Sequence, residues 1–335
     1  MMSERRDWLS QVQEEIEEPE RPIVDTHFHL WKGQPQFGRY MLDDLWADTG
    51  SGHRVEQMVF LECNSDFLDE VPEHLRPIGE TRFVAAAAAE AASAPADKTR
   101  IGAIVGTADM RLGAAVEEVL QAQLEAGGEL FKGIRFGACW DASDELTNSW
   151  PGQPENLYRD TTFREAFGRL APFGLSFDAF NYHPQLPDLA DLARAFPDTA
   201  IVSNHLGGML GIGPYREQRD EIFEVWKGHM RTLSDCPNVI MKLGGLAQGI
   251  NGFDWEEQAM PPTSDDFAET YRRYYLHAIE LFGPERCMFE SNFPVDKASV
   301  SYQVLWNAFK KMAAPFSSAE KEGMFRGTAT RVYRL

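Results

Sequence analysis

Cysteine is scarce in this sequence, and long apolar runs are missing. The four cysteines lie far apart among 335 residues without a CxxC pair, which argues against a disulfide framework or a thiolate zinc site. No segment stays apolar for the roughly 20 residues that cross a bilayer. Residues 1–22 also lack the apolar core of a secretion signal. We therefore expect a soluble cytoplasmic protein.

Positive charge is also in short supply. The chain has 32 lysines and arginines against 52 aspartates and glutamates, and its formal net charge is −20. A protein with this excess of negative charge repels phosphate backbones and anionic lipid surfaces. Nucleic acids and membranes are therefore not expected partners.

The sequence is rich in short β-branched runs that alternate with segments of helical periodicity. The predicted strands are residues 23–30, 55–62, 101–108, 131–137, 175–180, 200–205, 238–244 and 286–291. The predicted helices include residues 114–127, 186–197, 221–233 and 265–283. Strands that alternate with helices are typical of a parallel sheet.

Eight such units in a chain of this length indicate a single (β/α)8 TIM barrel, an α/β fold with its active site at the carboxyl ends of the strands. An open doubly wound sheet is the alternative, but no GxGxxG follows the first strand. A polar helix is predicted at residues 4–19. The expected organisation is therefore an N-terminal helical extension at residues 1–20 and a barrel at residues 21–335.

The first predicted strand reads IVDTHFHL and contains two histidines one residue apart. Residues i and i+2 of a strand face the same side, so His27 and His29 are expected to point together toward the barrel mouth. Two imidazoles at that place suit a divalent metal ion or an anionic substrate. Two hydrogen-bonded core histidines are the alternative, and the other strand ends must decide.

Polar side chains recur where later predicted strands end. The sixth strand runs into NHLGG with His205, and the eighth runs into ESNFP with Glu290 and Asn292. Arg135 and Lys132 lie on the fourth strand at an odd separation, so they point to opposite faces, and we expect Arg135 to face inward. Polar groups at several strand ends are typical of a barrel enzyme.

Further candidates flank these positions. His183 follows the fifth strand and is a candidate metal ligand, and Asp178 on that strand is a candidate substrate contact. Tyr215 and Arg216 lie in the loop GIGPYREQR after the sixth strand. They could clamp an anionic substrate, or they could belong to a solvated loop.

The motifs VDTHFH, GIR, YHPQL, NHLGG and RCMFESNFP occur in this order along the chain. With them the chain resembles the amidohydrolase-related family of metal-dependent TIM-barrel hydrolases, in the branch that contains sugar lactonases and the pyrone-dicarboxylate lactonase. The resemblance implies that His27 and His29 bind a metal ion, or the substrate in metal-free members. It also implies that His205 contacts the substrate carbonyl and that Arg135 holds a substrate carboxylate.

One position departs from the family pattern. The family reads GSDWP at the eighth strand and uses its aspartate to activate water, whereas ESNFP places Asn292 there. A carboxamide cannot take a proton from water near neutral pH. Glu290 replaces the family glycine and shares a face with Asn292, so we hypothesise that Glu290 is the base or a ligand, with Asp178 and Asp296 as competitors. The alternative is a buried ion pair of Glu290 with a lysine of the fourth or seventh strand.

The expected function is hydrolysis at a carbonyl, in particular lactone ring opening in a small oxygenated or carboxylated substrate. One divalent ion, zinc or manganese, is the expected cofactor, and the resemblance also allows a metal-free site. Non-oxidative decarboxylation or C–N hydrolysis on the same barrel is one alternative, and a non-catalytic binding protein on a degenerate barrel is another. A homodimer is expected by analogy with barrel enzymes.

Overall fold

The computed structural model describes residues 2–35 and 37–335, and it confirms the predicted barrel. Eight parallel strands pair in the order β1-β4-β5-β6-β7-β8-β9-β10. Beyond the strand ends, the His29 backbone N–H donates to the Phe293 carbonyl at 2.9 Å, so the ring is nearly closed. The strands are Pro22–Phe28 (β1), Arg54–Leu61 (β4), Arg100–Gly106 (β5), Phe131–Gly137 (β6), Ser176–Phe180 (β7), Ile201–Ser203 (β8), Val239–Leu243 (β9) and Cys287–Phe289 (β10). Each predicted strand overlaps one of them.

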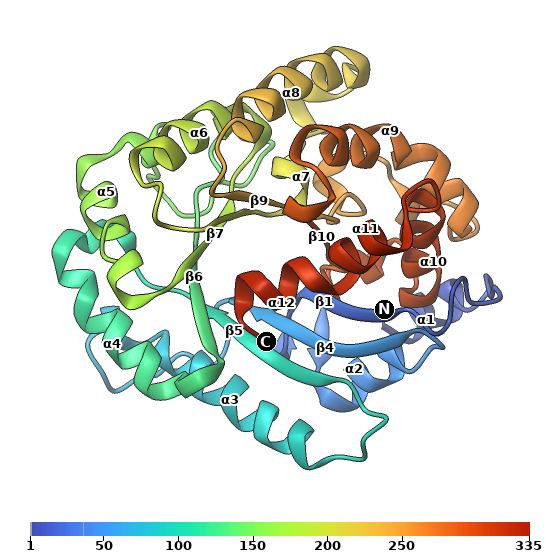
Figure 1. Ribbon diagram of the computed structural model, residues 1–335, viewed down its shortest axis with the longest axis horizontal. Coiled ribbons are helices and arrows are strands. Elements are labelled where there is room, and N and C mark those ends of the chain that lie inside the picture. Colours follow the sequence, from blue (N-terminus) through green and yellow to red (C-terminus); the bar gives the residue numbers. More distant parts are fainter. Residues whose placement is uncertain (1, 36) are drawn as a thin grey trace.

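Helices surround the strands (Figure 1). They are Met2–Leu9 (α1), Leu42–Thr49 (α2), Ile78–Ser93 (α3), Val116–Gly127 (α4), Thr161–Phe167 (α5), Leu186–Ala195 (α6), His205–Gly208 (α7), Arg219–Ser234 (α8), Ser264–Phe282 (α9), Tyr302–Met312 (α10), Ser318–Glu322 (α11) and Thr328–Tyr333 (α12). A short antiparallel pair, Trp31–Gln34 (β2) and Gly38–Tyr40 (β3), follows β1. Every helix in the described part of the chain is too short or too polar to span a bilayer.

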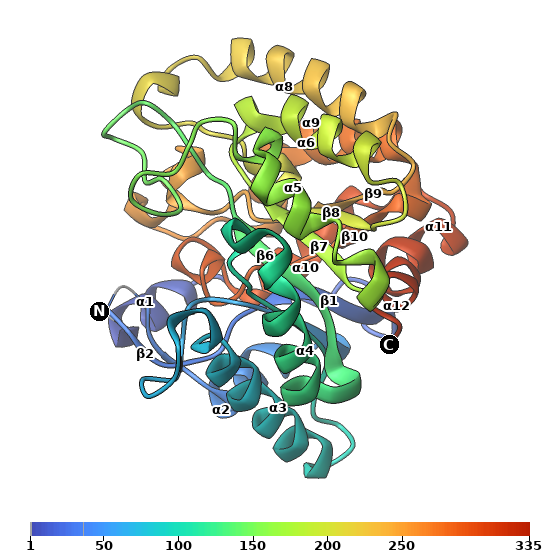
Figure 2. The same cartoon turned by 90° about the vertical axis from the view of Figure 1, so that its left-hand side faces the viewer.

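The last helix, α12, lies over the centre of the strand ring (Figure 1). Its Val332 and Tyr333 pack with valines from inside the barrel, such as Val24 and Val202. The Thr328 hydroxyl donates to the carbonyl of Glu285, just before β10 begins. Helix α12 therefore covers the end of the barrel where the strands start. In Figure 2 the loops that follow β6 and β8 extend to the opposite side of the molecule.

The predicted helix at residues 4–19 is wrong beyond Leu9, where α1 ends. Residues 12–17 instead cross the surface of α9 and α10. The Glu17 N–H donates to Asn307 Oδ1 at 2.9 Å, and the Ser264 N–H donates to a Glu14 carboxylate oxygen at 2.7 Å. Contacts with these two helices replace the internal hydrogen bonds that a longer helix would have. No local pattern in the sequence predicts these contacts.

We predict that Asn307→Ala lowers the free energy of unfolding by about 2 kcal/mol. Asn307 is fully buried, and its amide bonds the Glu17 N–H, the Glu15 carbonyl at 2.8 Å and the Glu14 carboxylate at 3.0 Å. Truncation leaves these groups without their partner. Urea unfolding measures the loss against Asn156→Ala, a control at an exposed turn. Equal stability of the two variants would contradict the role given to Asn307.

Candidate active site

The carboxyl ends of four strands bring imidazole and charged side chains together at the barrel mouth. His27 belongs to β1 and Arg135 to β6, whereas His205 follows β8 and Glu290 follows β10. All four are at most 6% exposed. Polar groups this deeply buried need hydrogen-bond partners, and these four supply most of them to one another.

Glu290 accepts hydrogen bonds from two imidazoles at once. Its Oε2 lies 2.8 Å from His27 Nδ1, and its Oε1 lies 2.8 Å from both Nδ1 and the backbone N of His205. Burial alone would raise the pKa of Glu290, but His205 and the Lys242 ammonium outweigh it and lower that pKa below its usual value. Glu290 is therefore a carboxylate. Each imidazole donates from Nδ1 and keeps Nε2 as an acceptor.

Arg135 lies on the other side of His27. Its Nη1 is 3.2 Å from His27 Nε2, its Nε donates to Glu62 Oε1 at 2.8 Å, and its Nη2 donates to the Glu62 carbonyl. Burial is the main reason that the pKa of His27 lies well below its usual value, and the neighbouring groups His205, Lys242 and Arg135 lower that pKa further. His27 is therefore a neutral imidazole between a carboxylate and a guanidinium.

His29 stands beside His27, with ring centroids 4.9 Å apart. Its Nδ1 donates to the Leu61 carbonyl at 2.8 Å, so its Nε2 is an acceptor. Burial, and then the charge of Arg135, keep the pKa of His29 well below its usual value, and the hydrogen bond to the Leu61 carbonyl offsets part of this shift. His27 and His29 thus lie side by side, as expected from their spacing, but the two neutral rings have different hydrogen-bond partners.

The backbone that carries His205 has an unusual conformation. φ is positive at four consecutive residues, with 54° at His205, 51° at Leu206, 77° at Gly207 and 68° at Gly208. Bulky residues rarely adopt this region, and such strain is held only where the surrounding structure fixes it. Here the Trp226 indole N–H donates to the Leu206 carbonyl at 2.8 Å, and the His205 N–H donates to Glu290.

Two glycines after β9 make room for the contact between His205 and Glu290. A Cβ atom on Gly245 would lie 2.2 Å from His205 Nδ1, and φ at Gly245 is +68°. A Cβ atom on Gly244 would lie 2.4 Å from Glu290 Cγ. Only glycine at both positions lets the imidazole and the carboxylate approach this closely.

Asn292 faces another carboxyl group rather than Glu290. Its Nδ2 donates to Asp296 Oδ1 at 2.7 Å, and φ at Asn292 is +55°. Burial, together with the negative charge of Glu290, raises the pKa of Asp296 well above its usual value. Asn292 is therefore bonded to Asp296 and offers no basic group at the position of the family aspartate.

A second polar group lies deeper in the barrel, around Asp178 on β7. Its Oδ1 accepts from Lys242 Nζ at 2.8 Å, from the Tyr333 hydroxyl at 2.9 Å and from Asn204 Nδ2 at 3.0 Å. Lys242 Nζ is also 3.9 Å from Glu290 Oε2. Lys242 thus lies near Glu290, as the alternative of a buried ion pair required. The shorter hydrogen bonds of Glu290, at 2.8 Å, are those with His27 and His205.

Three of the expected site residues have other partners. Within the described chain, His183, Tyr215 and Arg216 share no hydrogen bond with the cluster around Glu290. His183 Nδ1 accepts from the Leu210 N–H at 3.3 Å, and burial lowers the pKa of His183 to about 4. The Tyr215 hydroxyl donates to Asp141 at 2.7 Å, and Arg216 is exposed. These side chains belong to the loops above the mouth.

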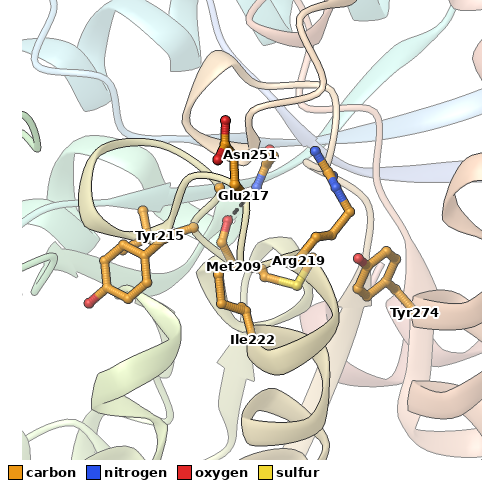
Figure 3. Close-up of a pocket in the computed structure, with 9 residues that line it drawn as sticks. Met209, Tyr215, Glu217, Arg219, Ile222, Asn251 and Tyr274 are labelled. Atoms are coloured by element: carbon orange, nitrogen blue, oxygen red, sulfur yellow. Dashed lines mark hydrogen bonds between the residues drawn. The ribbon is translucent and has the colours of Figure 1, made fainter.

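A small cavity lies beside these loops (Figure 3). Tyr215 and Tyr274 stand on opposite sides of it, and Asn251 Nδ2 donates to the Met209 carbonyl at 2.6 Å between them. Its volume of about 20 Å³ suffices for roughly one water molecule. It is therefore not a substrate pocket.

His27, His205 and Glu290 could hold a divalent metal ion. Each offers one ligand atom, and these atoms lie within 4.8 Å of one another. Two imidazole nitrogens and a carboxylate are a donor set that zinc accepts. This group shares His27 with the expected ligands, adds His205 and Glu290, and does not contain His29 or His183.

Glu62 and Tyr333 contribute to the cluster but were not among the sequence-based candidates. Glu62 closes the predicted strand 55–62, so the pattern of polar strand ends could have identified it. Tyr333 gave no such signal, because its helix enters from the end of the barrel opposite the mouth.

Comparison with known proteins extends these observations. The sequence model of the family described as amidohydrolase matches residues 24–335. An uncharacterised protein of Sinorhizobium fredii is 32% identical over 328 residues, which cover 93% of this chain and 98% of that protein. An L-fucono-1,5-lactonase of Burkholderia multivorans is 25% identical over 325 residues, which cover 93% of this chain and 96% of the lactonase.

Solved structures share the barrel. An amidohydrolase from Burkholderia multivorans with bound zinc superimposes with a TM-score of 0.72 at 22% identity, over 93% of this chain and 99% of that chain. The 5-carboxyvanillate decarboxylase of Sphingomonas paucimobilis superimposes with a TM-score of 0.56 at 13% identity, over 94% of this chain and 99% of that chain.

We predict that Gly245→Ala displaces His205 and lowers the free energy of unfolding by about 1–3 kcal/mol. The new methyl group would collide with the imidazole at a positive φ. Gly228→Ala is the control, because no atom lies within 4 Å of an added Cβ there. A crystal structure and urea unfolding measure both effects. An unmoved His205 in Gly245→Ala would show that the glycine is not required for the contact.

Proposed function

Because the chain belongs to the amidohydrolase family, we propose that this lactonase-like enzyme opens the lactone ring of a small oxygenated acid. The observation that carries the proposal is the Glu290 carboxylate, which holds Nδ1 of His27 and Nδ1 of His205 at 2.8 Å each. An imidazole held in this way is a general base for water. The name of the Burkholderia relative, an L-fucono-1,5-lactonase, supports the same chemistry.

His205 is the proposed base. While Nδ1 donates to Glu290, Nε2 keeps the lone pair that takes a proton from the attacking water. The imidazolium that forms is stabilised by Glu290, as a buried aspartate stabilises the histidine of a catalytic triad. Glu290 is itself 0% exposed with both oxygens bonded, so it acts through the imidazole and does not meet water directly. This arrangement dispenses with a base at Asn292.

Arg135 supplies the positive charge for the oxyanion. Its Nε and Nη2 already bind Glu62, so it cannot also form a bidentate clamp on a substrate carboxylate while they do. Its Nη1 stays beside His27 at the mouth. A guanidinium fixed in a buried site stabilises negative charge that develops on a carbonyl oxygen.

We also propose that one divalent ion can occupy the site, where His27, His205 and Glu290 would hold it. The lone pair of His205 would then be used as a ligand, so the role of His205 as base applies to the protein without the ion. A bound ion supplies Lewis acidity to the carbonyl under attack. His27 is neutral, and neutral imidazoles are the form that binds metals.

Hydrolysis is favoured over the two other functions that the sequence allows. Non-oxidative decarboxylation releases CO2 without a base for water, so it leaves the pairing of His205 with Glu290 unexplained. A binding protein would need neither the strained turn at His205 nor the glycines that make room for it.

We predict that the purified protein hydrolyses some of a panel of sugar 1,4- and 1,5-lactones. Glu290→Gln should lower kcat/KM by about 10²–10⁴, because a carboxamide cannot stabilise the imidazolium. Acid release in a pH-stat measures turnover, and the exposed Glu129→Gln is the matched control. Turnover of aromatic carboxylates to CO2 without any lactone hydrolysis would refute the proposal, as would a Glu290→Gln variant with undiminished activity.

Elemental analysis after expression with added zinc should find about one equivalent of metal per chain. The metal should be lost in His205→Ala, whose imidazole belongs to the ligand group, and kept in His183→Ala, whose imidazole does not. Less than about a tenth of an equivalent in the unmodified protein would contradict a resident ion. Arg135 would then be the charge that stabilises the oxyanion.

A further inference from the structure

We propose that Tyr333 is a positioning residue of the active site. By fixing the Asp178 carboxylate, its hydroxyl keeps the Lys242 ammonium away from Glu290 and so leaves Glu290 to the two imidazoles. The inference rests on the proposed function for its catalytic consequence, but its structural content can be tested without any substrate.

The orientation of the Asp178 carboxylate depends on the donors to one of its oxygens. Lys242, Tyr333 and Asn204 all donate to Oδ1, and Oδ2 has no partner among the described residues. A carboxylate with partners at both oxygens keeps its orientation when the partner of one oxygen is lost. Here the rotation of the carboxylate depends on the donors to Oδ1, and the Tyr333 hydroxyl is one of only two neutral ones.

The Lys242 ammonium lies between two carboxylates. Its Nζ lies 2.8 Å from Asp178 Oδ1 and 3.9 Å from Glu290 Oε2, and all three side chains are 0% exposed. Attraction between charges is strong at such depth, so a small movement of the ammonium changes which carboxylate it pairs with. The oxygen it would approach, Glu290 Oε2, is the one that accepts from His27 Nδ1. If the ammonium bonded this oxygen, the hydrogen bond from His27 Nδ1 would weaken. The Glu290 carboxylate would then also stabilise positive charge on His205 less well.

Packing inside the barrel holds Tyr333 itself in place. It is fully buried on α12, and its ring packs with the apolar residues inside the barrel. The Lys242 ammonium lies 5.7 Å from the centroid of this ring. Tyr333→Phe keeps the ring and its attraction for the ammonium, so this variant isolates the contribution of the hydroxyl.

The test is Tyr333→Phe, with a crystal structure and steady-state kinetics. We expect Lys242 Nζ to move to within about 3 Å of Glu290 Oε2, the distance of a charge-assisted hydrogen bond. With a lactone substrate, kcat should fall about tenfold while KM stays within about twofold, because Tyr333 does not touch substrate. Tyr275→Phe is the control, since the Tyr275 hydroxyl is buried without a partner in the described chain, and its kcat should not change.

Asp178→Asn provides a second variant, because it also weakens the attraction that keeps Lys242 from Glu290. The double variant with Tyr333→Phe should have a kcat no lower than Asp178→Asn alone, as expected for two groups that act through one contact. A Lys242 that keeps its distance from Glu290 in Tyr333→Phe would overturn the proposal whatever Asp178→Asn shows, and so would additive losses in kcat. If the unmodified enzyme opens no lactone, the proposed function fails, and the two crystal structures still decide the role of Tyr333.

Discussion

The mouth of the barrel depends on the hydrogen bonds that the imidazoles of His27 and His205 donate to the buried Glu290 carboxylate. They join β1, the turn after β8 and the segment after β10, which lie far apart in the sequence. A carboxylate at this depth is stable only with such partners, because removing a charge from water is costly. The strained turn at His205 and the two glycines after β9 both serve this contact. Fold and chemistry therefore depend on the same few bonds.

The charges around this contact do not cancel. Glu62, Asp178 and Glu290 are three buried carboxylates, and Arg135 and Lys242 are the two cations bonded to them or close to them. The balance leaves about one negative charge to be shared with the imidazoles. In the proposed hydrolysis this negative charge would stabilise an imidazolium while it exists, although burial and the nearby cations keep the pKa of His27 well below its usual value. The cluster could thus accept the positive charge that the proposed reaction creates.

The fold could be predicted from the sequence because each strand carries its own local signal. All eight strands, and helices such as α4 and α9, appear as short β-branched runs or as segments of helical period. The segment after α1 was predicted wrongly, because its conformation depends on distant residues. Asn307 bonds it from 290 residues away in the chain, and Ser264 bonds it from 250 residues away. Local periodicity contains no information about such contacts.

The grouping of the candidate site residues was predictable to a similar limit. Position at a strand end identified His27, His205, Arg135 and Glu290 as residues that meet, because parallel strands of a barrel end at one mouth. The pattern could not show which atoms meet. That Glu290 serves both imidazoles, while Asn292 faces Asp296, depends on side-chain directions fixed by positive φ at His205 and Asn292. Backbone conformations of this kind have no reliable signature in non-glycine residues.

Helix α12 has a consequence for the order in which the site is assembled. A ribosome makes the chain from its N-terminus, so all eight strands exist before residues 328–333 leave the exit tunnel. Until then the interior valines lack their cover, and Asp178 lacks one of its three donors. A nascent barrel can therefore pair its strands and bring His27 and Glu290 into reach, yet it completes its innermost polar layer only when its final helix docks.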